Sequence, residues 1–181
     1  MEKETIVINL FAGPGTGKST TAAGIFYHLK CQGINCELVT EYAKSKVWED
    51  SHKVLHDQIY IFGKQNHKME ILRGKVKVIV TDSPLLLSLL YGTTSTKFKD
   101  LVKEQFDTFD NWNYFLKRVK KYNTAGRSQT LEEAKELDSE LMRILYENNV
   151  KFSTIDGDTE AATIISDAVI AYISEKDVAQ N

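Results

Sequence analysis

The sequence predicts an α/β protein in which a parallel sheet is covered by helices on both faces. Short apolar segments rich in β-branched or aromatic residues are typical of buried parallel strands, and the chain has them at 5–11, 35–40, 76–81, 114–116 and 151–155. Segments with helical spacing of apolar residues separate them, which is the alternation expected for a parallel sheet. A glycine-rich turn follows the first segment directly. Ligands of such sheets bind beyond the carboxyl ends of the strands, so function is sought first after each strand.

The 181 residues suit a single domain, 1–181, with enough chain for a hydrophobic core. The net charge of −2 excludes a basic field around the whole molecule, so contact with nucleic acid would need a local patch. Cys31 and Cys36 lack the spacing of a disulfide framework, and we expect free thiols. The first residues do not resemble a signal peptide, and no apolar run approaches the ~18 residues of a membrane span. We therefore expect a cytoplasmic protein without a membrane partner.

The first helices are predicted from apolar spacing and from residues that begin or end helices. Residues 19–32 follow the glycine-rich turn, and Gly33 provides the stop. Residues 44–72 are expected to be mostly helical. The Ser-Pro pair at 83–84 is typical of an N-cap and a first helical position, so we expect a short, very apolar helix at 84–90.

The second half of the chain continues the alternation. Residues 98–109 carry a helical apolar stripe, whereas 118–128 are polar and basic without periodicity and are expected to form a loop. The Thr-x-x-Glu pattern at 130–133 is a capping box, and helical spacing continues behind it to Leu145. Residues 161–173 complete the alternation with a last helix.

The glycine-rich turn matches the P-loop pattern G-x-x-x-x-G-K-S/T, with Ala12 in place of the first glycine. Glycines let the backbone wrap around phosphates, and the following helix adds its positive N-terminal end. In this pattern Lys18 reaches the β- and γ-phosphates, and Ser19 offers its hydroxyl to Mg²⁺. We therefore predict a site for Mg²⁺ and ATP, with GTP left open, made by Gly13, Pro14, Gly15, Thr16, Gly17, Lys18, Ser19 and Thr20.

Other P-loop classes carry motifs that this sequence lacks. A GTPase should have an Asn-Lys-x-Asp motif that reads the base, and none is found. The Asp-x-x-Gly switch expected after the third strand is replaced by Asp-Ser-Pro-Leu at 82–85. ABC-type signatures are also absent, and the chain is too short for the extra domain of large ATPase assemblies. The small kinases remain.

Two acids follow neighbouring strands at the ligand edge of the predicted sheet. Glu41 follows the second strand and Asp82 follows the third. Either carboxylate could accept the proton of an attacking hydroxyl or help to hold Mg²⁺. The sequence does not decide between these roles; we favour Glu41 as the general base and Asp82 on the metal side, with Ser19.

A basic crossover follows the fourth strand. It carries Lys117, Arg118, Lys120, Lys121 and Arg127. Because phosphoryl transfer spreads charge over the γ-phosphate oxygens, arginines that close over the site would stabilise it and exclude water. We expect this role for the two arginines and a solvated surface for Lys120 and Lys121.

These segments together resemble the small P-loop kinases of nucleosides and nucleotides. The resemblance covers nearly the whole chain and lies in residues 12–20, TEYAK at 40–44, TDSPL at 81–85 and NTAGRSQT at 123–130. It is strongest for the ribosylnicotinamide-kinase-like branch and for short bacteriophage ATP-binding proteins of the AAA type within it. A bacteriophage protein of this kind would act in the host cytoplasm.

The resemblance implies a P-loop three-layer sandwich whose five-stranded parallel sheet has the order 2-3-1-4-5. It also implies an arginine-bearing lid at about 118–130. The implied site residues are an acid after the second strand, two lid arginines and a loop beside adenine: Glu41, Arg118, Arg127, Asp156 and Gly157. Deoxynucleoside kinases carry an arginine directly after the third-strand acid, where this chain has Ser83. This difference weakens the case for assigning the substrate of deoxynucleoside kinases to this protein.

The acceptor site is expected in the segment after the second strand, where Glu41, Tyr42, Trp48 and Gln58 could face a base. We predict an ATP-dependent phosphotransferase that acts on a hydroxyl or phosphate of a nucleoside or nucleotide. One alternative is a kinase of a hydroxymethylated base within bacteriophage DNA. The other is a nucleotide-binding regulator or NTPase without transfer chemistry. The sequence leaves a homodimer open.

Overall fold

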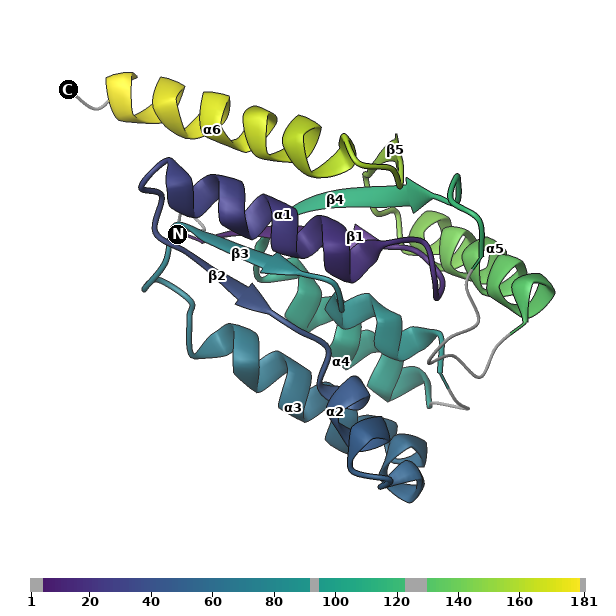
Figure 1. Cartoon of the computed structure of the whole chain (residues 1–181). Coiled ribbons are helices and arrows are strands. Elements are labelled where there is room, and N and C mark those ends of the chain that lie inside the picture. Colours follow the sequence, from purple (N-terminus) through teal and green to yellow (C-terminus); the bar gives the residue numbers. More distant parts are fainter. Residues whose placement is uncertain (1–4, 92–94, 123–129, 180–181) are drawn as a thin grey trace.

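Five parallel strands form one sheet with helices packed on both faces (Figure 1). In this computed structural model, which describes residues 5–91, 95–122 and 130–179, the strand order is β2-β3-β1-β4-β5. The predicted α/β class and the strand order implied by the family resemblance are both confirmed. None of the helices in the described ranges is both long and apolar enough to cross a bilayer.

Strands and helices alternate along the chain. The strands are β1 (Ile6–Phe11), β2 (Cys36–Val39), β3 (Val78–Thr81), β4 (Asp110–Lys117) and β5 (Ser153–Asp156). The α-helices are α1 (Lys18–Cys31), α2 (Tyr42–Trp48), α3 (Gln58–Glu70), α4 (Thr96–Asp107), α5 (Leu131–Glu147) and α6 (Ala161–Ala179), and two short 3₁₀ helices are η1 (His52–His56) and η2 (Leu85–Leu89). The segment predicted to be mostly helical at 44–72 is thus divided among α2, η1 and α3.

The sheet buries a hydrophobic core on each face. Successive side chains of a strand point to opposite faces, so Ile8 packs with α1 and α6, whereas Val7 packs with α3, α4 and α5. Every residue of β1 is buried. This strand therefore lies at the centre of both cores, and the loop that follows it starts from a rigid support.

Strand β4 is longer than the predicted segment at 114–116. Its first half is polar, and asparagine is depleted in strands, so the pattern did not indicate a strand there. In the structure the Nδ2 of Asn9, on β1, donates to the Oδ1 atoms of Asn111 at 2.8 Å and Asn113 at 3.0 Å. These cross-strand hydrogen bonds stabilise the polar half of β4 beside the central strand.

The apolar segment after β3 is one 3₁₀ turn and not the predicted α-helix at 84–90. Pro84, with an extended ψ of 147°, precedes the turn in the N-cap position, so Ser83 is not the cap. The Ser83 carbonyl instead accepts a hydrogen bond from Nε2 of Gln65 at 3.2 Å. This long-range contact directs the chain away from the helical path, and it is invisible in the local sequence.

Helix α1 packs directly against α6, and two glycine substitutions test that contact. Both Gly24 and Gly63 lie inside helices, where alanine is favoured by about 1 kcal/mol. A Cβ on Gly24 would lie 2.7 Å from Cβ of Ala162, whereas nothing lies within 4 Å of a Cβ on Gly63. We expect Gly63→Ala to raise the free energy of unfolding by about 0.5–1 kcal/mol. We expect Gly24→Ala to lower it by about 1–2 kcal/mol, because overpacking outweighs propensity.

Urea unfolding of the two variants measures both effects. A stabilising Gly24→Ala would contradict the close packing of α1 on α6.

Candidate functional site

The P-loop connects the buried end of β1 to the first turn of α1. Gly17 is the N-cap of α1 and has a φ of 111°, a left-handed conformation that favours glycine. The Thr16 hydroxyl donates to the Gly13 carbonyl at 2.9 Å and is buried, which fixes the loop from within. Ala12, in place of the first glycine of the pattern, does not have a positive φ. An alanine is therefore compatible with the loop at this position.

The Lys18 side chain is held by the carbonyls of its own loop. Its Nζ donates to the Ala12 oxygen at 2.6 Å and to the Gly13 oxygen at 3.2 Å. Burial lowers the pKa of Lys18, and the charges of Glu41 and Asp82 act in the opposite direction. The ammonium group is thus kept beside the loop. A change in the Lys18 side-chain conformation would let it contact the phosphates that such a loop binds.

Ser19 and Asp82 form a contact suited to Mg²⁺. Ser19 Oγ donates to Asp82 Oδ2 at 2.6 Å, and Asp82 is 5% exposed at the end of β3. No cluster of three His, Cys, Asp or Glu residues that could hold a metal is present in the described parts of the chain. A hydroxyl and one carboxylate nevertheless fit Mg²⁺, because this ion is usually held by one or two carboxylates together with phosphates and water.

Glu41 lies next to this contact at the end of β2. Its backbone N–H donates to the other carboxylate oxygen of Asp82, Oδ1, at 3.2 Å. Burial raises the pKa of Glu41; Lys18 opposes the shift and Asp82 adds to it. The structure therefore brings together Lys18, Ser19, Glu41 and Asp82. A carboxylate with a raised pKa is suited to proton transfer.

Gln65 connects the two acid-bearing strand ends and was not identified from the sequence. It is 4% exposed on α3. Its Oε1 accepts the N–H of Tyr42 at 2.9 Å, and its Nε2 donates to the Ser83 carbonyl at 3.2 Å. Tyr42 directly follows Glu41, and Ser83 directly follows Asp82. Gln65 therefore fixes the positions of the two acids relative to each other. The only sequence signal is a polar residue on the buried face of an amphipathic helix.

Lys68, one turn further along α3, also reaches this edge of the sheet. Its Nζ donates to the Thr40 carbonyl at 2.6 Å. Burial lowers the pKa of Lys68, and the negative charge of Asp82 opposes that shift. Lys68 therefore adds a cation near the acids that the sequence did not indicate.

Aromatic side chains lie near Glu41. The hydroxyls of Tyr42 and Tyr60 are 2.9 Å apart, and their rings meet edge to face. Tyr91 is 42% exposed as a whole, but burial at its hydroxyl raises its pKa to about 12, and the charge of Glu41 adds to this shift. Of the two other predicted contacts, Trp48 is 77% exposed on α2, and Nε2 of Gln58 donates to the Leu55 carbonyl at 2.7 Å.

The loop after β5 also lies close to the P-loop. A Cβ on Gly157 would lie 2.8 Å from the Thr16 carbonyl and 2.9 Å from that of Lys117, so only glycine fits. Asp156 ends β5 and lies 4.0 Å from Lys117 in an exposed ion pair. The Nζ of Lys120 lies 3.6 Å from the position of a Cβ on Gly17. A side chain expected to be merely solvated is therefore close to the P-loop.

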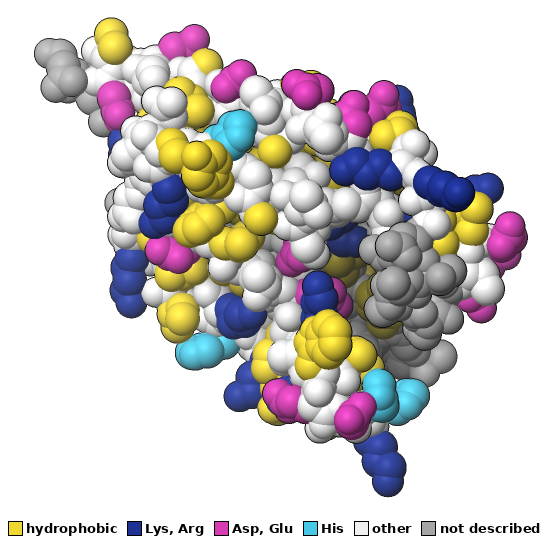
Figure 2. Space-filling view, viewed as in Figure 1, with side chains coloured by type: hydrophobic (Ala, Val, Ile, Leu, Met, Phe, Trp, Pro, Cys, Tyr) yellow, Lys and Arg dark blue, Asp and Glu magenta, His cyan; other side chains and the backbone are white. Residues whose placement is uncertain are grey.

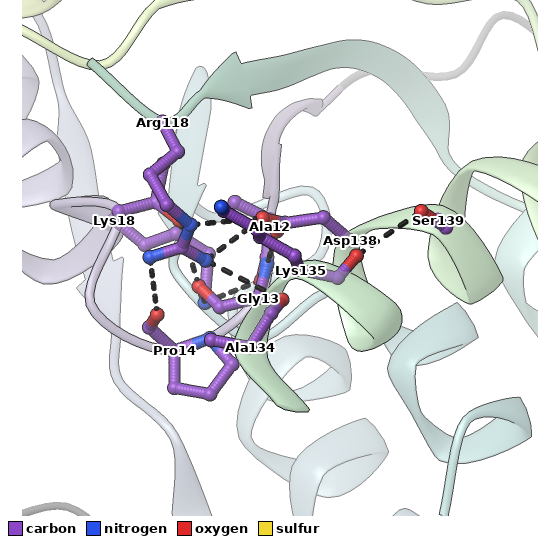
Figure 3. A network of polar contacts seen from close by, with 10 residues as sticks. Ala12, Gly13, Pro14, Lys18, Arg118, Ala134, Lys135, Asp138 and Ser139 are labelled. Atoms are coloured by element: carbon purple, nitrogen blue, oxygen red, sulfur yellow. Dashed lines mark hydrogen bonds and ion pairs between the residues drawn. The ribbon is translucent and has the colours of Figure 1, made fainter. Parts of the chain in front are cut away.

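Arg118 follows β4 and contacts the outer side of the P-loop (Figure 3). Its Nη2 donates to Asp138 of α5 at 2.8 Å, and its Nη1 donates to the Pro14 carbonyl at 2.8 Å. In this structure the guanidinium is thus held directly against the P-loop. Arg127 lies outside the described residues, as does most of the predicted lid at 118–130.

Comparisons with known proteins agree with this geometry. Residues 7–162 match the family model of an AAA domain. A solved structure of the NadR protein in complex with NR has the same fold, with a TM-score of 0.69 at 18% sequence identity over 93% of this chain and 52% of that one. This chain therefore spans about half the length of NadR, and the likeness extends to the fold alone. A search of curated proteins finds no match.

The Gln65 bridge generates a stability prediction. Leucine has a similar volume but cannot bond to the Tyr42 N–H or the Ser83 carbonyl, and an unsatisfied buried polar group costs about 1–3 kcal/mol. We expect Gln65→Leu to lower the free energy of unfolding by about 2 kcal/mol or more. The exposed Gln32→Leu serves as the control and should change it by less than about 0.5 kcal/mol. Equal stability of the two variants in urea would show that the bridge is not needed.

Proposed function

Because the chain belongs to the AAA domain family, whose P-loop fold it shares, we propose that it is an ATP-dependent kinase that phosphorylates a hydroxyl of a nucleoside-type acceptor. The observation that carries this proposal is the arrangement of Asp82, whose two carboxylate oxygens contact Ser19 Oγ and the Glu41 N–H. Asp82 thereby contacts the residue that follows the P-loop lysine, and Glu41 lies beside Asp82. A protein that only binds nucleotide does not need the second acid, Glu41.

We assign the phosphates of ATP to the P-loop amides and Lys18, and Mg²⁺ to Ser19 and Asp82. Lys18 would exchange the carbonyls of Ala12 and Gly13 for phosphate oxygens. When bound, Mg²⁺ supplies positive charge that offsets the phosphates and the neighbouring acids. Asp156 and Gly157, whose loop touches Thr16, are assigned to the adenine side.

Glu41 is proposed as the general base. Its raised pKa brings it nearer to neutral pH, where a general base is most effective while it remains ionised. An acceptor hydroxyl must lose a proton during attack, whereas an acceptor phosphate is already ionised. The carboxylates of Glu41 and Asp82 would also repel a phosphate, so a hydroxyl acceptor is favoured over a nucleotide phosphate.

The acceptor itself is proposed to contact the tyrosines beside Glu41. Tyr42, Tyr60 and Tyr91 offer aromatic faces and hydroxyls of the kind that bind a base or a sugar. Trp48 and Gln58 are retained as outer contacts of a larger acceptor. NadR, which has the same fold, was solved with NR, and NR is therefore included among the acceptors to be tested.

One observation favours the second candidate, a kinase of a hydroxymethylated base within DNA. Trp48 is 77% exposed on α2, where its ring could stack on a base of a polynucleotide. Against it, basic and acidic side chains are interspersed over the face shown in Figure 2. The free nucleoside therefore remains the first proposal. The third, a regulator without transfer, would leave Glu41 without a role.

Transfer of label from γ-labelled ATP tests the proposal. Nucleosides including NR, nucleotides and DNA that contains hydroxymethylated bases are offered in parallel with Mg²⁺. We expect label on a nucleoside and none on a nucleoside monophosphate. Label on DNA alone, decreasing as salt rises, would select the second candidate, and label released only as phosphate would contradict both kinase proposals.

Lys18→Ala is the matching variant for nucleotide binding. It should abolish both ATP binding and transfer, because the ammonium that contacts the phosphates is lost. Lys30→Ala, an exposed lysine at the other end of α1, should leave both unchanged. Unchanged ATP affinity in Lys18→Ala would rule out the P-loop as the nucleotide site.

The pH dependence of transfer tests the role of Glu41. The base must be deprotonated, so kcat/KM should fall as the pH drops through the raised pKa of Glu41. Glu41→Gln should lower kcat by about 10²–10⁴-fold and remove this acidic limb. Glu37→Gln, on β2 just before Glu41 and exposed beside Lys30, is the control. Retention of full activity and of the acidic limb in Glu41→Gln would assign the base elsewhere.

A further inference from the structure

We propose that Asp138 and Arg118 are positioning residues that hold the P-loop from its outer side in the shape that accepts a nucleotide. This inference rests on the proposed nucleotide binding at that loop. Neither residue is required to touch the nucleotide. Figure 3 shows the contacts, which join the loop, the end of β4 and helix α5.

Both the N–H and the carbonyl of Gly13 form hydrogen bonds with side chains. The N–H of Gly13 donates to Oδ1 of Asp138 at 2.5 Å. Its carbonyl accepts from Thr16 Oγ1 at 2.9 Å and from Lys18 Nζ at 3.2 Å. The loop is therefore held from the outside by a carboxylate and from the inside by its own side chains.

Arg118 completes the outer contact. Its Nε and Nη2 donate to Oδ2 of Asp138 at 3.1 and 2.8 Å, while Nη1 donates to the Pro14 carbonyl at 2.8 Å. The two side chains are 10% and 19% exposed. Charge-assisted, bidentate bonds of this kind are strong and directional. Because the pair is largely buried, removal of either partner leaves the other without compensation.

Helix α5 comes close enough to make Gly13 sterically necessary. A Cβ at that position would lie 2.7 Å from the Ala134 carbonyl and 2.7 Å from Oδ1 of Asp138. The glycine thus permits backbone-to-helix contact, and the Asp138 bond uses that proximity. The Gly13 amide is consequently directed at α5.

The outer contacts acquire a function when Lys18 moves. The Lys18 ammonium has three N–H donors and uses two of them here, so contact with several phosphate oxygens would draw it from the Ala12 or Gly13 carbonyl and weaken an inner support of the loop. Asp138 and Thr16 still hold the Gly13 peptide, so the loop keeps its shape and less ordering is needed on binding. All nitrogens of the Arg118 guanidinium have partners in this arrangement, which argues for support of the loop and against direct stabilisation of the γ-phosphate.

A double-mutant cycle on ADP binding tests the inference, because ADP lacks the γ-phosphate. Mg²⁺–ADP titrations compare Arg118→Ala, Asp138→Ala and the double variant with the wild type. We expect each single variant to weaken ADP about tenfold and the double variant to be no weaker, since the pair acts as a unit. The KM for ATP should rise in parallel while kcat stays within about twofold. Glu140→Ala and Arg143→Ala remove an exposed pair on the same helix and should change nothing.

Hydrogen exchange of the nucleotide-free protein provides a second readout. The amides of residues 12, 13 and 15–17 should exchange faster in Arg118→Ala and Asp138→Ala than in the wild type. Arg118→Lys and Asp138→Asn, which keep part of the bonding, replace any alanine variant that does not fold and should show smaller effects.

Additive losses, or ADP affinity and loop exchange that do not change, would overturn the inference. A loss of kcat in Arg118→Ala with unchanged ADP affinity would also overturn it, because the arginine would then act on the transferring phosphate. Failure of the wild type to bind ADP would instead refute the proposed function. The exchange experiment would still decide whether the pair holds the loop.

Discussion

The arrangement of the site depends on the central place of β1 in the sheet. Because β1 pairs with β3 on one side and β4 on the other, the loop at its end lies between the residues that follow those two strands. Asp82 reaches the loop from β3 and Arg118 reaches it from β4. Every residue of β1 is buried, so the P-loop starts from a strand that is packed on both faces. A different strand order would place these side chains at separate edges.

A balance of charge around Lys18 follows from that geometry. Burial lowers the pKa of Lys18. The negative charges of Glu41, Asp82 and Asp138 raise this pKa, and the positive charge of Arg118 lowers it. A triphosphate adds further negative charge to this group of acids. The proposed Mg²⁺ would therefore offset the charge of the site's own carboxylates as well as that of the nucleotide, and the Ser19–Asp82 contact is where we propose that the ion binds.

The parts of the structure that depend on local sequence were predictable. The strand-turn-helix of the P-loop, the acids at two strand ends and the capping box of Thr130 and Glu133 follow from short-range spacing, and the structure contains each of them. The 3₁₀ turn after β3 and the polar half of β4 were not predicted, because long-range bonds from Gln65 and Asn9 decide them. Asp138 was missed for the same reason, because 125 positions of the sequence separate it from Gly13. From the sequence pattern of α5 alone, Asp138 resembles an ordinary surface acid.

A crystal structure with Mg²⁺ and a non-hydrolysable ATP analogue tests the central claim most directly, namely that the P-loop is preformed and that Lys18 and the neighbouring acids act on its ligand. We predict that Lys18 Nζ turns from the Ala12 and Gly13 carbonyls toward the phosphates, that Mg²⁺ lies against Ser19 and Asp82, and that the Gly13 N–H keeps its bond to Asp138. An analogue bound away from the P-loop, or a Gly13 amide that turns from Asp138 to a phosphate, would contradict it.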